Sequence, residues 1–191
     1  MKIISGSLRG TVIPTVKNAK YRPTTGKFKE ALFSILSSGN FAENQGFIDK
    51  DVLDLFSGSC SIGFEALSRG AGHVTFVDID RNNLQIAKNF AIKNNLGSKV
   101  TFINSDVTQL KNSKKKYDII FIDPPYDEGL VDKSLSILHE YSWLNPNSYI
   151  IIEMGQYEKI NIEKHYEIFL ERKYGTSKMV ILNYKQSNNR I

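Results

Sequence analysis

The sequence of 191 residues predicts an α/β fold with a seven-stranded, mostly parallel sheet. Three observations lead to this prediction. From residue 51 onward, short apolar runs alternate with segments of helical periodicity, as in βαβ units. A glycine-containing turn joins the first of these runs to the first helical segment. The last two apolar runs are separated only by a short turn, which predicts an antiparallel hairpin at one edge of the sheet.

The alternating region contains five of the seven predicted strands. They span residues 51–56, 73–77, 99–103, 117–122 and 148–153. The helices between them are predicted at residues 62–69, 81–95 and 130–141. The hairpin strands are predicted at residues 166–171 and 179–184. Right-handed crossovers would cover both faces of the sheet with helices. Residues 49–184 are therefore expected to form one domain, followed by a polar tail at 185–191.

The first 48 residues have a different pattern and are expected to form an extension. Residues 2–6 and 10–14 resemble the two sides of a short hairpin arm, with Arg9 between them. A helix is predicted from Thr25, because Phe28, Ala31, Leu32, Ile35 and Leu36 recur at the spacing of one apolar helix face. Lys27 and Lys29 fall off that face, and Gly39-Asn40 is expected to end the helix.

The composition is that of a globular protein, with 41% hydrophobic and 24% charged residues. No apolar stretch approaches the roughly 18 residues of a membrane span, and no signal peptide is recognisable. The single cysteine, Cys60, excludes an internal disulfide and a cysteine-rich zinc site. A cytoplasmic location is expected. The net charge of +5 agrees with a polyanionic partner without requiring one.

The tetrapeptide Asp123-Pro124-Pro125-Tyr126 directly follows the predicted strand at residues 117–122. It therefore lies at the carboxyl edge of the sheet, where α/β proteins bind ligands. The prolines donate no N–H, so their carbonyl groups can face outward as acceptors. An acid, two carbonyls and an aromatic ring suit a planar group that carries an NH2, such as a nucleobase. The alternative is a proline-rich turn that only ends a strand.

Other acids occupy similar positions in the sequence. Asp54 lies in the end of the first strand, Asp78 ends the second, and Asp106 follows the third. Asp78 comes roughly 20 residues after the glycine turn, where an acid can bind ribose hydroxyls. Asp106 is placed to meet the exocyclic amine of adenine, and Asp80 is expected to cap the following helix. Each acid alone is commonly a cap or turn residue, but together they predict an acidic rim.

The turn after the first strand matches a dinucleotide fingerprint poorly. Gly58 and Gly63 keep the outer spacing, but Cys60 occupies the middle glycine position. Asp54 would repel a pyrophosphate and would suit a cation instead. An adenosine with a cationic, amino-acid-bearing tail and no phosphate, S-adenosylmethionine, fits the predicted rim. Cys60 is not interpreted as a nucleophile, because no histidine lies close in sequence.

The chain resembles the ribosomal small-subunit methyltransferase D family of class I methyltransferases, which have a Rossmann-like fold. The resemblance covers residues 1 to about 184, and Cys60 departs from it where the family usually has a glycine. The motifs are Ile4-Ser5-Gly6-Ser7-Leu8-Arg9-Gly10, Arg22-Pro23-Thr24-Thr25, Lys29-Glu30-Ala31-Leu32-Phe33-Ser34-Ile35-Leu36, Asp54-Leu55-Phe56-Ser57-Gly58-Ser59, Glu65-Ala66-Leu67-Ser68-Arg69-Gly70-Ala71, Asp123-Pro124-Pro125-Tyr126 and Tyr174-Gly175. The glycine turn and the Asp123-Pro124-Pro125-Tyr126 motif mark amino-methyltransferases in general, whereas the N-terminal motifs single out this family.

The resemblance implies methylation of the N2 amine of a guanine in 16S rRNA. It also implies S-adenosylmethionine as the cofactor, S-adenosylhomocysteine as the product, no metal, and a monomer that acts on the small subunit or its assembly intermediate. The expected cofactor-binding residues are Asp54, Phe56, Ser57, Gly58, Gly63, Asp78, Ile79, Asp106 and Val107. The expected RNA-binding residues are Arg9, Arg22, Lys27 and Lys29, and the alternative for these is a solvated charged surface.

For catalysis, Asp123 and the Pro124 carbonyl are expected to accept the two N–H bonds of the target amine, with Pro125 completing the motif. Tyr126 is expected to stack on a base that has left the RNA stack. Three other functions stay open from the residues alone. They are methylation of adenine N6 or cytosine N4 in DNA or RNA, a nucleotide-dependent oxidoreductase, and a non-catalytic RNA-binding module.

Overall fold

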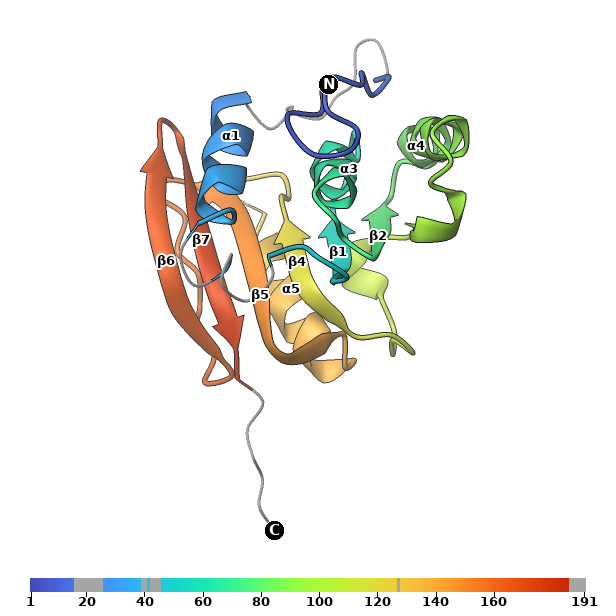
Figure 1. Ribbon diagram of the computed structural model, residues 1–191. Helices are drawn as coiled ribbons and strands as arrows, with labels where there is room; N and C mark the ends of the chain where they lie inside the picture. The colour runs from blue at the N-terminus through green and yellow to red at the C-terminus, as the bar shows by residue number, and fades with distance from the viewer. Residues whose placement is uncertain (16–25, 39–40, 42–45, 127, 186–191) are drawn as a thin grey trace.

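The computed structural model describes residues 1–15, 26–38, 41, 46–126 and 128–185, and a sheet with helices on both faces dominates it (Figure 1). The strand order is β3-β2-β1-β4-β5-β7-β6. The strands are β1 (Asp51–Leu55), β2 (His73–Asp78), β3 (Val100–Asn104), β4 (Tyr117–Ile122), β5 (Leu144–Gly155), β6 (Tyr166–Tyr174) and β7 (Ser177–Tyr184). The helices are α1 (Gly26–Ile35), α3 (Ser61–Ser68), α4 (Arg81–Lys93) and α5 (Leu130–Glu140), with 3-10 turns η1 (Gly97–Lys99) and η2 (Val107–Gln109).

Parallel pairing joins β3, β2, β1, β4 and β5, and the final hairpin adds β7 and β6 in antiparallel orientation. The predicted fold is therefore confirmed. Leu55 of β1 lies beside Val77 of β2 and Ile122 of β4. These three strands thus end at one edge of the sheet, and the loops that follow them meet there.

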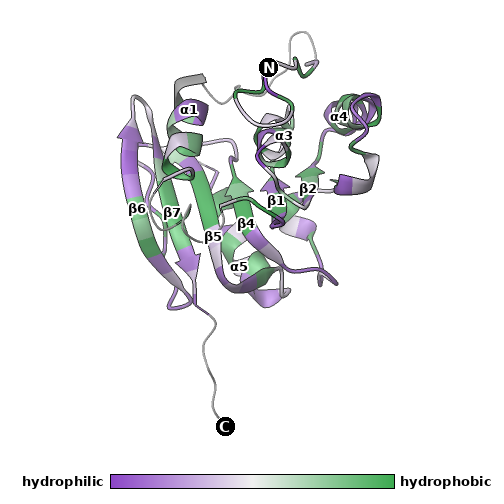
Figure 2. Cartoon of the chain, viewed as in Figure 1, coloured by the Kyte–Doolittle hydropathy of each residue, from purple (hydrophilic) through white to green (hydrophobic). Residues whose placement is uncertain are grey.

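Side-chain alternation along the strands divides the core between the two faces of the sheet. Residues of α1, α3 and α4 share one hydrophobic cluster with Val52, Phe76 and Phe121. Residues of α5 share the other cluster with Leu53 and Ile122. Figure 2 shows hydrophobic residues concentrated in the central strands, whereas the edge strand β6 is more hydrophilic. Burial on both faces explains why the central strands are nearly continuous apolar runs.

The N-terminal arm forms the predicted hairpin, with an antiparallel bridge between Lys2 and Val12. The amide of Ile3 donates to Thr11 O at 3.0 Å, and the amide of Ile13 donates to Met1 O at 2.7 Å. Ile3 and Ile13 are 1% exposed. The arm therefore contributes two side chains to the main core.

The arm is fixed to α3 through two polar residues of that helix. The Glu65 carboxylate accepts hydrogen bonds from the amides of Ile4 at 2.7 Å and Ser5 at 3.0 Å. Gly6 has φ +83°, and a Cβ there would lie 1.7 Å from Ser68 O. Only glycine fits such a close approach of two backbones. These contacts explain why the arm returns to α3 at this position.

Several predicted bounds differ from the structure by one or more residues. Strand β5 begins at Leu144, four residues earlier than predicted, because Leu144 pairs with Tyr117 of β4 across an irregular register. Asn145-Pro146-Asn147 has the composition of a turn and concealed this extension. Helix α1 ends at Ile35, and the predicted stop at Gly39-Asn40 lies outside the described residues. No helix within the described ranges is long and apolar enough to span a membrane.

Candidate active site

A cavity of about 530 Å³ opens at the carboxyl edge of the parallel strands. Its lining residues lie near the ends of β1, β2 and β5, follow β1, β2 or β4, or begin α3 and α4. They are Asp54, Phe56, Ser57, Gly58, Ser59, Ser61, Ile62, Asp78, Ile79, Asp80, Asn83, Asp123, Pro124, Pro125, Tyr126 and Glu153. The predicted gathering of Asp54, Asp78 and Asp123 at one edge of the sheet is confirmed, whereas Asp106 does not line the cavity.

Four acids reach this cavity from the same face of the sheet. Asp54, Asp78, Asp123 and Glu153 each come two residues after a member of the cluster on the α3 side, Val52, Phe76, Phe121 and Ile151 respectively. Because strand side chains alternate with period two, all four carboxyl groups lie on the α3 side of the sheet. Their charges therefore concentrate at the mouth of one cavity.

The turn between β1 and α3 has an unusual backbone. Phe56, Gly58 and Cys60 have φ values of +56°, +47° and +59°. Two of these residues carry side chains, for which the left-handed region costs on the order of 1–3 kcal/mol. The Gly58 amide donates to Asp78 at 2.6 Å, and the Cys60 amide donates to Ser57 O at 2.6 Å. The structure tolerates the strained turn because these bonds hold it in place.

Cys60 adopts the conformation that a glycine would take more easily, and its side chain is completely buried. Its thiol lies 3.5 Å from the Ser57 hydroxyl. Burial raises the pKa of the Cys60 thiol well above its usual range. The thiol therefore stays protonated at neutral pH, which agrees with the prediction that it is no nucleophile.

Asp54 has a structural contact as well as a place in the cavity wall. It is 3% exposed and accepts a hydrogen bond from the Gly63 amide at 3.0 Å. It thereby satisfies a donor in the first turn of α3, which the helix's own N-cap residue does not. Burial raises the pKa of Asp54 well above its usual range, the Gly63 amide opposes this, and the charges of Asp123 and Asp78 add to it. A cation in the cavity would reverse the effect.

Asp78 and Ile79 form the part of the wall nearest α4. One carboxylate oxygen of Asp78 accepts from Gly58 and the other accepts from the Asp80 amide at 2.7 Å. A carboxylate has further lone pairs, so these bonds leave capacity for a ligand hydroxyl. Ile79 is 73% exposed, which is unusual for isoleucine and gives the wall an apolar surface. Asp80 caps α4 as predicted.

The Asp123-Pro124-Pro125-Tyr126 segment lines the opposite wall. The Tyr126 hydroxyl donates to Glu153 Oε1 of β5 at 3.1 Å. Burial, reinforced by the Glu153 charge, raises the pKa of Tyr126 to about 12. The phenol is therefore a neutral donor at physiological pH, and the bond holds the ring against the end of β5.

Three predicted cofactor-binding residues are absent from the cavity lining. Gly63 is buried, and a Cβ there would lie 2.3 Å from Phe76 Cε1, so it is a packing glycine between α3 and β2. Asp106 caps η2, accepting from the Thr108 amide at 2.8 Å. Val107 is 2% exposed in the core cluster of α5. Direct cofactor contact by these three residues stays a prediction.

The predicted RNA-binding residues have different outcomes. Arg9 is exposed in the arm. Lys29 is 2% exposed, and its Nζ lies 3.4 Å from Glu65 Oε2. The prediction that Lys29 lies off the apolar face and contacts RNA is wrong, because α1 buries this side chain against α3. Arg22 and the side chain of Lys27 lie outside the described residues.

Several lining residues were not found from the sequence, notably Glu153 and Asn83. Glu153 ends the fifth predicted strand, so it carried the same positional signal as the other acids. Asn83 lies in the first turn of α4, where its side chain donates to Asp80 at 3.2 Å. Nothing in the local sequence distinguishes it from a surface asparagine.

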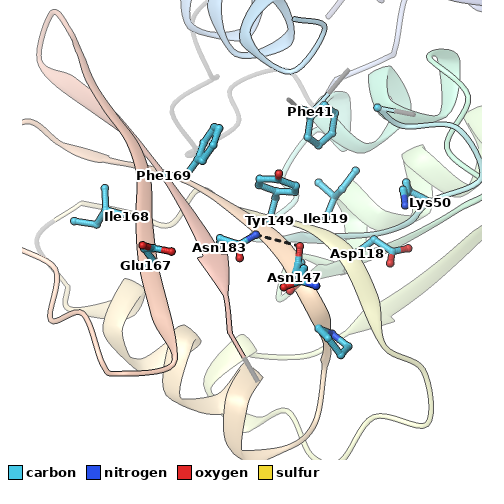
Figure 3. A pocket seen from close by; sticks show the side chains of 13 residues that line it. Phe41, Lys50, Asp118, Ile119, Asn147, Tyr149, Glu167, Ile168, Phe169 and Asn183 are labelled. Atoms are coloured by element: carbon cyan, nitrogen blue, oxygen red, sulfur yellow. Dashed lines mark hydrogen bonds between the residues drawn. The ribbon is translucent and has the colours of Figure 1, made fainter. Parts of the chain in front are cut away.

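A second and larger hollow, of about 680 Å³, lies over β4, β5, β7 and β6 at the opposite edge of the sheet (Figure 3). Phe41, Tyr149 and Phe169 contribute its aromatic side chains. Of its two acids, Asp118 already accepts from the Asp51 amide and from Asn145 Nδ2, both at 2.9 Å, and Glu167 is ion-paired with Lys185. The acids and proline motif of the first cavity make that cavity the better candidate despite its smaller volume.

Comparison with known proteins agrees with this geometry. The sequence profile of the family described as Conserved hypothetical protein 95 matches residues 1–183. The chain belongs to this family. The Uncharacterized methylase RP545 of Rickettsia prowazekii is 37% identical, and the match covers 96% of this chain and 98% of that protein. The Ribosomal RNA small subunit methyltransferase D of Buchnera aphidicola (subsp. Acyrthosiphon pisum) is 35% identical, with 89% and 86% covered.

The solved structure of the Putative methyltransferase yhhF from Escherichia coli has a TM-score of 0.84 to this chain at 26% identity, covering 97% of this chain and 98% of that one. The class I methyltransferase fold is thus confirmed. The Conserved hypothetical protein 95 match begins at residue 1, so it includes the N-terminal arm as well as the sheet. The resemblance noted in the arm and proline motifs is confirmed at the level of the family.

Proposed function

We propose that this chain transfers the methyl group of S-adenosylmethionine to the exocyclic N2 amine of a guanine in 16S rRNA. The observation that carries the proposal is the single cavity that joins the strand-end acids to the Asp123-Pro124-Pro125-Tyr126 segment. One part of the cavity suits a cationic adenosine derivative, and the other suits a planar amine.

The cavity fits S-adenosylmethionine in charge and in shape. Burial raises the pKa of Asp54, and the charges of Asp123 and Asp78 add to this, so a positively charged ligand is favoured there and a pyrophosphate is not. The exposed Ile79 offers an apolar surface for adenine beside Asp78, whose carboxylate can still accept from ribose hydroxyls. When bound, S-adenosylmethionine supplies an activated methyl group on a sulfonium.

The residues of the proline motif position the amine. Asp123 and the Pro124 carbonyl accept its two N–H bonds, which orients the nitrogen lone pair toward the methyl group. The amine lone pair is delocalised into the purine ring, so orientation and hydrogen bonding favour the pyramidal geometry that transfer requires. The amine then loses one proton to Asp123 or to water.

Tyr126 supports a base that has left the RNA stack. Its hydroxyl is held by Glu153, so the ring is a fixed wall rather than a free side chain. A fixed ring can stack on a flipped base with little loss of side-chain entropy. With its raised pKa, Tyr126 stays protonated and does not act as the base.

The choice of 16S rRNA rests on the family and on charge. Relatives that cover most of the chain are named small subunit methyltransferase D. The chain has a net charge of +5 and an exposed Arg9 on its arm, which suits a polyanionic partner. We also propose that the enzyme acts in the cytoplasm and as a monomer.

Methyl transfer from labelled S-adenosylmethionine to 30S subunits, naked 16S rRNA and duplex DNA tests the proposal, with nucleoside digestion to identify the product. We expect label in N2-methylguanosine from at least one RNA substrate. Label in N6-methyladenosine or N4-methylcytosine, or label in DNA alone, would contradict it.

Two variants separate the parts of the site. Asp123→Ala should lose at least about a hundredfold in transfer rate and keep most of its affinity for S-adenosylmethionine, because Asp78 and Ile79, which are proposed to contact the ribose and adenine, are unchanged. Asp78→Ala should instead weaken cofactor binding, measured by calorimetry. Full turnover by Asp123→Ala would refute the assigned chemistry.

A further inference from the structure

The turn between β6 and β7 lies at the same edge of the sheet as the candidate active site. Strand β6 is antiparallel to β7, and β7 is antiparallel to β5, so β6 runs in the direction of β4 and β5. Figure 1 shows β6 and β4 pointing the same way. The loop that leaves β5 therefore lies beside the β6–β7 turn, and Gln156 N donates to Thr176 O at 3.0 Å.

Tyr157 projects from this loop and is 84% exposed, the largest exposed fraction among the large hydrophobic side chains of the described residues. The loop that carries it is well ordered by hydrogen bonds. The Gly155 amide donates to Glu158 Oε2 at 2.6 Å, and the Glu158 amide donates to Gly155 O at 3.1 Å. An aromatic ring is thus held out into solvent by a structured turn, at no evident benefit to folding.

The position of Tyr157 connects it to the proposed target site. Glu153, four residues earlier on the same segment, lines the cavity and holds the Tyr126 hydroxyl. The target base and Tyr157 would therefore both lie near the carboxyl end of β5. A nucleotide next to the target in the RNA chain would come within reach of the Tyr157 ring.

The charges around Tyr157 favour a nucleic acid over a protein partner. Lys159 follows it in the loop, and Arg172 and Lys173 precede the β6–β7 turn; all three are exposed. The nearby acid Glu171 is ion-paired with Lys178 at 3.1 Å, and Glu158 binds the Gly155 amide. An exposed ring among basic side chains is the arrangement that binds single-stranded nucleic acid, in which bases stack on aromatics and phosphates meet cations.

We infer that Tyr157 is a stacking platform for an unpaired nucleotide that neighbours the target base, with Lys159 contacting its phosphates. The inference rests on the proposed function, because it takes RNA as the partner. It adds a binding surface outside the cavity, on the β5 and β6–β7 side.

Binding of naked 16S rRNA to Tyr157→Ala, Tyr157→Leu and Tyr157→Phe tests the inference, with affinity measured at several salt concentrations. Stacking on one base is worth about 5- to 150-fold in Kd. We expect the Ala and Leu variants to lose affinity in that range, while Phe stays within about twofold of the wild type. The transfer rate at saturating RNA should be unchanged in all three, since Tyr157 does not line the cavity.

Phe169→Ala is the matched control, because Phe169 is an exposed aromatic, 46% exposed, at the other end of β6. It should bind RNA like the wild type. The inference is overturned if Tyr157→Ala binds RNA normally, if Tyr157→Phe loses as much affinity as Ala, or if Phe169→Ala loses an equal amount. The binding measurement does not require methyl transfer. A failure of the proposed guanine methylation would therefore appear in the nucleoside digests and not in these RNA affinities.

Discussion

Glu65 offers the sharpest test of how the N-terminal arm and α1 are held to the main domain. Its carboxylate is completely buried and accepts from the amides of Ile4 and Ser5 and from Arg69 Nε at 2.9 Å. It is also the counter-ion of Lys29, at 3.4 Å. One side chain of α3 therefore binds the arm, α1 and its own helix.

Removing this charge leaves Lys29 buried without its partner. Breaking a buried ion pair from one side costs about 3–5 kcal/mol. The two arm amides lose an acceptor as well, but residues 4 and 5 are only half-buried, so water can replace part of that bond. Glu65→Gln should therefore lower the free energy of unfolding by about 4 kcal/mol, a large part of the 5–15 kcal/mol typical of a domain.

Removing the charge of Lys29 instead of that of Glu65 should cost less stability. In Lys29→Met, Arg69 still neutralises Glu65, and burial already lowers the pKa of Lys29, so part of its charge is disfavoured in the folded state. We expect a loss of about 1–2 kcal/mol for this variant. The double variant Lys29→Met/Glu65→Gln should be more stable than the sum of the single losses predicts.

Urea unfolding followed by tryptophan fluorescence measures these differences. Trp143 is the chain's one tryptophan and is buried in the core beside α5, distant from the substitutions in sequence and on the other face of the sheet. A loss below about 1 kcal/mol for Glu65→Gln, or additive losses in the double variant, would refute the argument that Glu65 and Lys29 form a buried, interdependent pair.

Two further predictions concern pH. Because a bound cation favours the ionised form of Asp54, affinity for S-adenosylmethionine should fall as pH drops through the raised pKa of Asp54, by up to about tenfold per pH unit, and calorimetry should show a flatter profile for Asp54→Asn. An unchanged slope in that variant would remove Asp54 from the linkage. Tyr166 donates to Leu135 O at 2.6 Å, and burial raises its pKa above that of the unfolded chain. The stability that the protonated Tyr166 hydroxyl contributes is fully present below about pH 10 and is lost as the pH rises further. Tyr166→Phe should therefore lower stability by about 1 kcal/mol at pH 7 and show a smaller alkaline loss in urea titrations between pH 8 and 11. A steeper alkaline loss than in the wild type would contradict this.

The common direction of the strands at the site follows from local sequence signals. Alternation of apolar runs with helical periodicity specifies parallel βαβ units, and such units place all strand ends at one edge. The positions of Asp54, Asp78 and Asp123 at those ends were therefore readable from the sequence. Glu153 was equally readable, since it ends a predicted strand in the same way.

Contacts between distant segments could not be predicted from the sequence. Lys29 has the local pattern of a surface lysine, and its burial depends on Glu65, 36 residues away in another helix. The bond from Tyr126 to Glu153 spans 27 residues and determines how the tyrosine faces the cavity. Charged partners of this kind are chosen by packing geometry, which no local periodicity encodes.

The turn between β1 and α3 likewise depends partly on local sequence and partly on tertiary contacts. The sequence determined that a turn stands between β1 and α3, because strand and helix patterns meet there with Gly58 between them. Only the tertiary structure decided that Cys60 takes φ +59°. Hydrogen bonds from Gly58 to Asp78 and from Gly63 to Asp54 hold the turn from outside. Local sequence thus determined which elements form and in what order, whereas contacts across the assembled sheet decided the geometry of the site, because those contacts exist only once the strands have paired.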